Sequence, residues 1–318
     1  MQKQCSMNIS TIALTLLLPP TILTFSLTFP FVIPGVALVA VKTYIPAAYA
    51  YTTDETRFDN SSWTWGTDYL LTIAMGVLGY FILNAPGQSS KRLKLYSAAL
   101  LACYGLSTLA GGYAHQTIHG VEMLNTSTFR ILWIVCVGNV SFASCWMGLI
   151  GREVVRIFGS QPIPLGPWYF WPFYGAFMTG ACAAGYMSFK RPACDIFIAG
   201  ITQFPSTFYC LGGLMMAARN NLMRKKVATN GTAICHLVDN VLLRYRTMYY
   251  VGFIGNAPLL PMYPLLVQYT DMTLAGINTL LHTWLLIMWG MQGLSLLHLC
   301  RVVGEFEKVQ DISDGKKD

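Results

Sequence analysis

The residues most able to do chemistry are three histidines set in apolar runs. His115 and His119 lie four residues apart at the end of the run 95–113, and His282 lies in the run 274–299. Residues four apart share one face of a helix, so His115 and His119 can approach one ion or substrate if the helix continues through both. Ionisable groups inside a bilayer cost roughly 2.5 to 3.5 kcal/mol, so histidines at this depth indicate a functional site.

Two further polar residues accompany the histidines. Asp68 lies at the outer end of an earlier apolar run, and Asn278 precedes His282 by four residues, on the same helical face. A catalytic zinc site takes three nitrogen or oxygen ligands from the protein and keeps a position for water. The sequence therefore predicts a zinc site with His115, His119 and His282 as metal ligands and with Asp68 and Asn278 as catalytic residues.

Each assignment has a plainer alternative that the spacing leaves open. Asp68 could cap its helix, because acidic residues favour the first turn. His119 could lie beyond the end of its helix, hydrogen-bonded to a carbonyl group or to water. No complete zinc-protease signature such as HExxH is present in the chain.

The composition identifies an integral membrane protein. The 318 residues are 54% hydrophobic and only 11% charged, and the mean hydropathy is +0.48, which ordinary soluble domains do not show. Apolar stretches of about 20 residues recur along the whole chain and leave no room for a separate soluble domain. Such spans must be helical, because barrel strands would show short alternating segments. The fold class expected is all-α.

Seven helices form the predicted bundle, which occupies residues 67–301. They are expected at 67–83, 95–113, 129–150, 168–189, 196–218, 249–267 and 274–299. The sixth contains Pro258, Pro261 and Pro264, so we expect a kink whose freed carbonyl groups are met by neighbouring helices.

The segments outside the bundle have different characters. Residues 11–50 are almost wholly apolar and end in Ala-Ala-Tyr-Ala at 47–50, so the segment 1–50 is typical either of a signal peptide with a small-residue cleavage site or of an additional transmembrane helix. The polar segment 51–66 is expected on the lumenal or extracellular side. The charged tail 302–318 is expected to be disordered and cytoplasmic.

The orientation follows from the charges of the loops. The net charge of +7 comes from basic residues in short loops between spans, which the positive-inside rule places in the cytoplasm, so no nucleic-acid partner is indicated. The glycosylation sequons at Asn60 and Asn125 fall on the opposite side. We expect a multi-pass protein of the ER and Golgi membranes or of the plasma membrane.

The spacing of these residues resembles the superfamily of alkaline ceramidases and progestin/adiponectin-type receptors, and a less characterised group of related multi-span proteins. The resemblance rests on a small residue, Gly111, four before His115, and on the pair Asn278-xxx-His282. It implies seven helices and a zinc ion held by Ser-xxx-His in helix two, an aspartate near helix three and His-xxx-His in helix seven. His115 and His282 match that pattern.

Three positions depart from the family pattern. Gly111 stands where the family has serine, Asn278 stands where it has the first histidine of helix seven, and Glu122 is the acid nearest the start of helix three.

Three functions therefore remain open: a zinc-dependent hydrolase of a lipid amide or ester, a non-catalytic receptor or sensor, and a small-solute transporter. The expected partners are membrane lipids and a lipid-like or small-molecule ligand, and the sequence does not indicate an oligomeric state. For a shared ion, the imidazoles of His115 and His282 must lie within roughly 8 Å.

Overall fold

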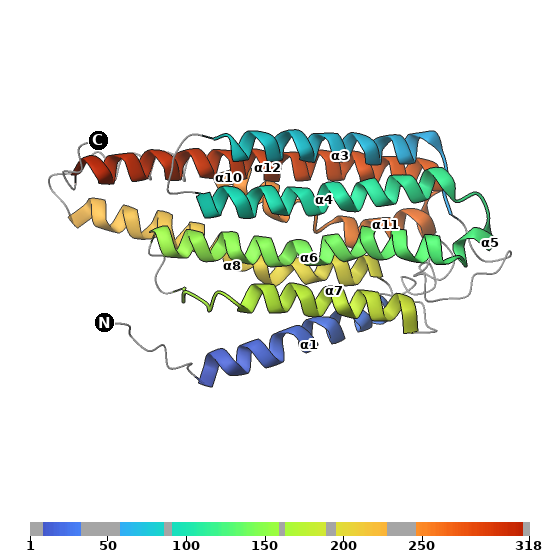
Figure 1. Cartoon of the computed structure of the whole chain (residues 1–318), viewed down its shortest axis with the longest axis horizontal. Coiled ribbons are helices and arrows are strands. Elements are labelled where there is room, and N and C mark those ends of the chain that lie inside the picture. The colour runs from blue at the N-terminus through green and yellow to red at the C-terminus, as the bar shows by residue number, and fades with distance from the viewer. Residues whose placement is uncertain are drawn as a thin grey trace.

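The computed structural model describes residues 9–32, 58–85, 91–158, 163–188, 195–227 and 246–313, and within these ranges the chain is all-helical with no strand. The predicted fold class is confirmed there. The long helices run side by side along the long axis of the molecule (Figure 1). The helices are α1 (Ile9–Val32), α3 (Ser62–Leu83), α4 (Lys91–Thr117), α5 (Val121–Leu124), α6 (Ser127–Phe158), α7 (Phe170–Ser188), α8 (Asp195–Val227), α10 (Arg246–Ile254), α11 (Leu259–Tyr269) and α12 (Leu274–Ser313).

Four helices in the described ranges are long and apolar enough to cross a membrane. They are α3, α4, α6 and the part of α12 from Leu274 to Gly304. This number agrees with an integral membrane protein. Each of the seven stretches predicted as a bundle helix holds helix in the structure.

Two helix ends differ from the prediction. α3 begins at Ser62 rather than near residue 67, because the hydroxyl of Ser61 caps it by accepting a hydrogen bond from the backbone N–H of Thr64. Asp68 therefore lies beyond the first turn, and the alternative that it caps the helix is wrong. α12 continues to Ser313, where the sequence predicted a disordered tail from residue 302, because residues such as glutamate, lysine and glutamine favour helix.

The bundle brings α3 against both α4 and α12, while α4 packs on α6 and α6 packs on α7 and α8. Small residues set these close approaches. A Cβ atom on Gly112 of α4 would lie 2.9 Å from Cβ of Asp68 on α3, and one on Gly252 of α10 would lie 2.8 Å from the backbone nitrogen of Gln292 on α12. Side chains larger than hydrogen would force these helices apart.

The sixth predicted helix is broken, as its prolines indicated. α10 ends at Ile254 and α11 begins at Leu259, with Pro258 at its start. The indole N–H of Trp284 on α12 donates a 2.8 Å hydrogen bond to the carbonyl oxygen of Gly255 in this break. The expectation of a kink with a freed carbonyl met by a neighbouring helix is confirmed.

The N-terminal helix α1 lies alongside α7 and α8. Its residues Leu18, Ile22 and Leu23 pack against a buried cluster that includes Phe170 and Tyr174 of α7. The small residues 47–50, on which the signal-peptide alternative depends, lie outside the described residues.

The described cysteines form no disulfide among themselves. Five of these six side chains are buried within the bundle, where cysteine acts as a small apolar residue. They are Cys103, Cys145, Cys182, Cys210 and Cys300.

Candidate metal centre

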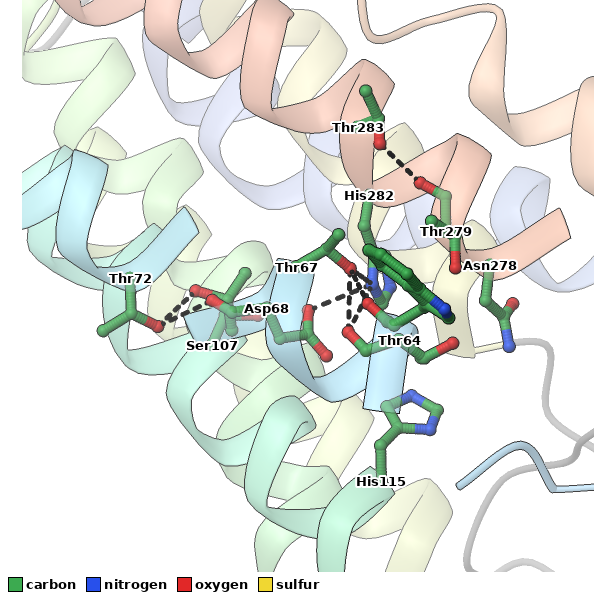
Figure 2. A network of polar contacts seen from close by, with 12 residues as sticks. Thr64, Thr67, Asp68, Thr72, Ser107, His115, Asn278, Thr279, His282 and Thr283 are labelled. Carbon is green, nitrogen blue, oxygen red and sulfur yellow. Dashed lines mark hydrogen bonds and ion pairs between the residues drawn. The ribbon is translucent and has the colours of Figure 1, made fainter. Parts of the chain in front are cut away.

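Three side chains able to hold a metal ion converge from three helices. Asp68 of α3, His115 of α4 and His282 of α12 each offer one ligand atom, and these atoms lie within 4.8 Å of one another. The two imidazole rings are 6.1 Å apart between centroids, inside the limit of roughly 8 Å for a shared ion. Figure 2 shows Asp68, His115 and His282 approaching one another from different helices, with Asn278 one turn away from His282.

The backbone fixes the protonation of His115. Its Nδ1 lies 2.5 Å from the carbonyl oxygen of Asp59, and its ring stacks on that of Phe58 with centroids 4.7 Å apart. Because a carbonyl oxygen only accepts, Nδ1 carries the hydrogen. The hydrogen bond thus selects the tautomer in which a neutral ring keeps the lone pair of Nε2 for a ligand, which is the usual arrangement of metal-binding histidines.

His282 is fixed in the same way by the first turns of α3. Its Nδ1 lies 3.3 Å from the carbonyl oxygen of Thr64 and 3.1 Å from the hydroxyl of Thr67. The one hydrogen of that hydroxyl has acceptors at 2.8 Å in the carbonyl groups of Trp63 and Thr64, so the hydroxyl oxygen can accept from His282. This ring also keeps Nε2 as its lone-pair nitrogen.

Asp68 supplies the carboxylate of the group. It is only 4% exposed, its Oδ1 lies 3.5 Å from Nδ1 of His282, and no hydrogen-bond donor in the described ranges reaches its Oδ2. An unpartnered carboxylate oxygen in the interior is costly, and a cation would satisfy it. Gly111 faces this oxygen: a Cβ atom there would lie 3.6 Å from Oδ2. The carboxylate thus lies beside the position at which the resembling family has serine.

Asp59 contacts His115 and also the helix that carries His282, and the sequence prediction missed it. Its carboxylate accepts hydrogen bonds from the hydroxyl of Thr64, from the backbone N–H of Ser61 at 2.9 Å and from Nδ2 of Asn278 at 3.2 Å. Burial opposes ionisation of Asp59, but these hydrogen bonds outweigh burial and lower the pKa of the carboxyl below its ordinary value. Asn278 therefore helps to hold Asp59 in place.

His119 does not join the group in the structure. α4 ends at Thr117, so the helix does not carry His119 onto the face of His115. His119 is exposed, and its Nδ1 lies 2.8 Å from Nδ2 of Asn60. Glu122, the acid nearest the start of helix three, is exposed on α5.

The site forms part of the wall of a mainly apolar cavity of about 290 Å³. Asp68, His115, Asn278 and His282 contribute to its lining, with apolar side chains that include Trp133, Val137, Phe204, Leu260 and Trp289. Ligand sites in proteins commonly combine an apolar cavity with a few polar groups.

The donor set fits zinc better than a hard cation. Two imidazole nitrogens and one carboxylate oxygen are a usual three-residue ligand set of catalytic zinc, whereas magnesium and calcium take oxygen ligands. Zinc bonds of about 2.0 to 2.2 Å would require the three groups to draw somewhat closer together. Comparisons with protein-family models, with curated proteins and with solved structures found no match to the chain.

Proposed function

We propose that this chain is a seven-span membrane protein that hydrolyses a lipid amide or ester with a zinc ion held by Asp68, His115 and His282. The observation that carries the proposal is the meeting of these three side chains at the wall of an apolar cavity. The resemblance to the alkaline ceramidases, which matches His115 and His282, supports the same reading.

The proposed roles follow from the contacts of each side chain. Carbonyl oxygens hold the Nδ1–H groups of His115 and His282, so the neutral form of each ring would donate its Nε2 lone pair to a metal. Asp68 offers one oxygen to the ion and keeps a second oxygen able to accept a proton from water. A zinc ion in such a site supplies Lewis acidity, which polarises a carbonyl group and activates water for attack.

A substrate from the bilayer suits the cavity. Its walls are mainly apolar, and Phe208 of α8 both lines it and is 59% exposed on the outside of the bundle. In a membrane that outer surface meets lipid tails, so a hydrocarbon chain could enter sideways. A membrane lipid with a carbonyl group near its head is therefore the proposed substrate class.

Elemental analysis of the purified protein tests the metal site. The wild type should carry about one zinc ion per chain, and His115→Ala and His282→Ala should each lose most of it. His119→Ala is the matched control, because His119 is exposed and lies outside the group, and this variant should keep its zinc. Wild-type protein without a transition metal, or full retention in both site variants, would refute the metal site.

Hydrolysis is tested separately with lipid amides and esters in detergent or nanodiscs. Release of fatty acid should require zinc, and Asp68→Asn should lower it at least 100-fold, in keeping with the usual effect of a lost metal ligand or proton acceptor.

A receptor or sensor is the second candidate, because Asn278 donates to Asp59 at the position where the resembling family has a metal-binding histidine. Bound ligand without hydrolysis or metal would favour that function. A polar path open to both faces would instead favour a small-solute transporter.

A further inference from the structure

The cavity contains a second group of polar side chains away from the metal centre. These are the amides of Gln203 on α8 and Gln292 on α12. Gln292 follows His282 by ten residues on one helix, which is about 15 Å at a rise of 1.5 Å per residue. The two polar groups thus lie well apart, with Leu285 and Trp289 of the lining between them on α12.

One of these amides has an unused oxygen atom. Oε1 of Gln292 is buried, and within the described part of the chain it has no hydrogen-bond partner. Gln292 is only 2% exposed. Buried polar atoms are nearly always paired, so an unpaired acceptor beside the cavity calls for a donor that comes from outside the chain.

Gln203 completes the group from the opposite wall. Its Oε1 accepts a 2.6 Å hydrogen bond from the hydroxyl of Tyr104, whose ring stacks on Trp289 with centroids 4.1 Å apart. With its oxygen engaged, Gln203 has its amide N–H groups to offer. The two side chains together provide one acceptor and one donor.

The backbone around this group is built for close approach. Gly252 of α10 lies directly against Gln292, shortly before the break between α10 and α11. Irregular backbone at membrane depth is tolerated where it is buried in protein or lines a cavity, and broken helices commonly form binding sites there.

We propose that Gln203 and Gln292 bind a neutral hydrogen-bond donor, a hydroxyl or an amide N–H, carried on the hydrocarbon chain of the ligand about 15 Å from the carbonyl group at Asp68. Among the described residues of the lining, Asp68 is the only carboxylate and none is a lysine or arginine, so nothing near the amides would balance a charge on that donor. The inference rests on the proposed function in one respect: the proposed function is what places the carbonyl end of the ligand at Asp68.

Three long-chain methyl ketones test the inference, because a ketone has the carbonyl group but no bond to hydrolyse. One carries no hydroxyl, one carries it about 12 carbons from the carbonyl group, which spans about 15 Å in an extended chain, and one carries it only about 4 carbons away. Binding to the full-length protein in nanodiscs is measured by displacement of a fluorescent long-chain ketone. The ketone with the distant hydroxyl should bind about tenfold more tightly than the other two.

Gln292→Leu should remove this preference, and continued binding of the plain ketone shows that the variant is folded. Gln116→Leu is the matched control, because Gln116 is an exposed glutamine of α4 outside the lining, and it should keep the preference. If Gln292→Leu does not fold, Gln203→Met gives the same test from another helix. Equal binding of all three ketones to the wild type, or a preference that survives the substitutions, would overturn the inference.

Zinc content measured on the same preparations separates the two proposals. A preference for the distant hydroxyl in protein without zinc would overturn the proposed hydrolase alone. Zinc-loaded protein that binds the three ketones equally would overturn the second polar position alone.

Discussion

At the scale of single residues, Asp59 holds the site together through two kinds of acceptor. Its carbonyl oxygen fixes His115, and its carboxylate holds Thr64, Ser61 and Asn278. Together these contacts join the segment before α3 to α4 and α12. The position of both metal-centre histidines therefore depends on a residue that need not touch the metal.

Asp59→Asn should lower stability and change its dependence on pH. The folded pKa of Asp59 lies below its unfolded value of about 3.9, so the stabilisation is complete above that value and is lost as the pH falls through the folded pKa. The variant should lose about 1 to 3 kcal/mol at neutral pH and show a smaller further loss in acid than the wild type.

Thermal unfolding in detergent between about pH 3 and pH 7 measures this effect. Asp271→Asn, at an exposed carboxylate just before α12, is the control and should behave as the wild type. Parallel pH curves for the wild type and Asp59→Asn would argue against the role of Asp59.

The sequence allowed the side chains of the site to be predicted from their chemistry, but it did not indicate which backbone carbonyl groups accept their hydrogen bonds. The types of Asp68, His115 and His282 and the expected alternation of helices were enough to predict that they lie together. Asp59 was missed because its contact with His115 uses a carbonyl oxygen, which every residue has. His119 matched the helical spacing, but α4 ends two residues before it, and helix ends are poorly marked in sequence when no glycine or proline stands at the boundary.

At the scale of helices, the close packing of α3 on α4 depends on Gly112. A Cβ atom there would lie 2.9 Å from Cβ of Asp68 and 3.1 Å from the ring of Tyr69. Gly112→Ala should therefore push α3 away and cost about 1 to 3 kcal/mol of stability. The variant should also bind less zinc, because it displaces Asp68.

Gly66→Ala is the matched control for that substitution. A Cβ atom on Gly66 of α3 would meet nothing within 4 Å, and alanine favours a helix over glycine by roughly 0.5 to 1 kcal/mol. This variant should be as stable as the wild type or slightly more stable. If both alanines have the same effect on the melting temperature, the packing argument is wrong.

The break between α10 and α11 depends on Trp284. Trp284→Phe keeps the aromatic packing but removes the hydrogen bond to the carbonyl oxygen of Gly255, and we expect a loss of about 1 to 3 kcal/mol. Thermal unfolding checks this, with Trp168→Phe, at a side chain 68% exposed, as the control. An unchanged melting temperature for Trp284→Phe would mean that another group satisfies the carbonyl oxygen.

The prolines predicted this break, but they could not predict which residue donates a hydrogen bond to the freed carbonyl group. Pro258 marks where helical hydrogen bonding stops, and that rule is local. The donor, Trp284, lies 29 positions later in the chain, so its role depends on how α10 packs against α12. Sequence patterns of single helices do not contain that information.

At the scale of the whole molecule, the proposed orientation can be mapped by glycosylation. Asn60 and Asn125 should be modified in a eukaryotic host, because both are expected in the lumen, and Asn60→Gln and Asn125→Gln should each remove one endoglycosidase-sensitive shift in mobility on gels. The exposed side chain of Asn60 is accessible for this modification. Modification at Asn230, which lies outside the described residues, would reverse the orientation.

The buried cysteines bear on how long the protein survives once it is taken out of the membrane. The folded bundle shields five thiols from dissolved oxidants and from alkylating dyes. Global unfolding exposes all of them together, and oxidation or mixed disulfide formation then prevents refolding. The working lifetime of the purified protein in air is therefore set by its unfolding rate rather than by its equilibrium stability.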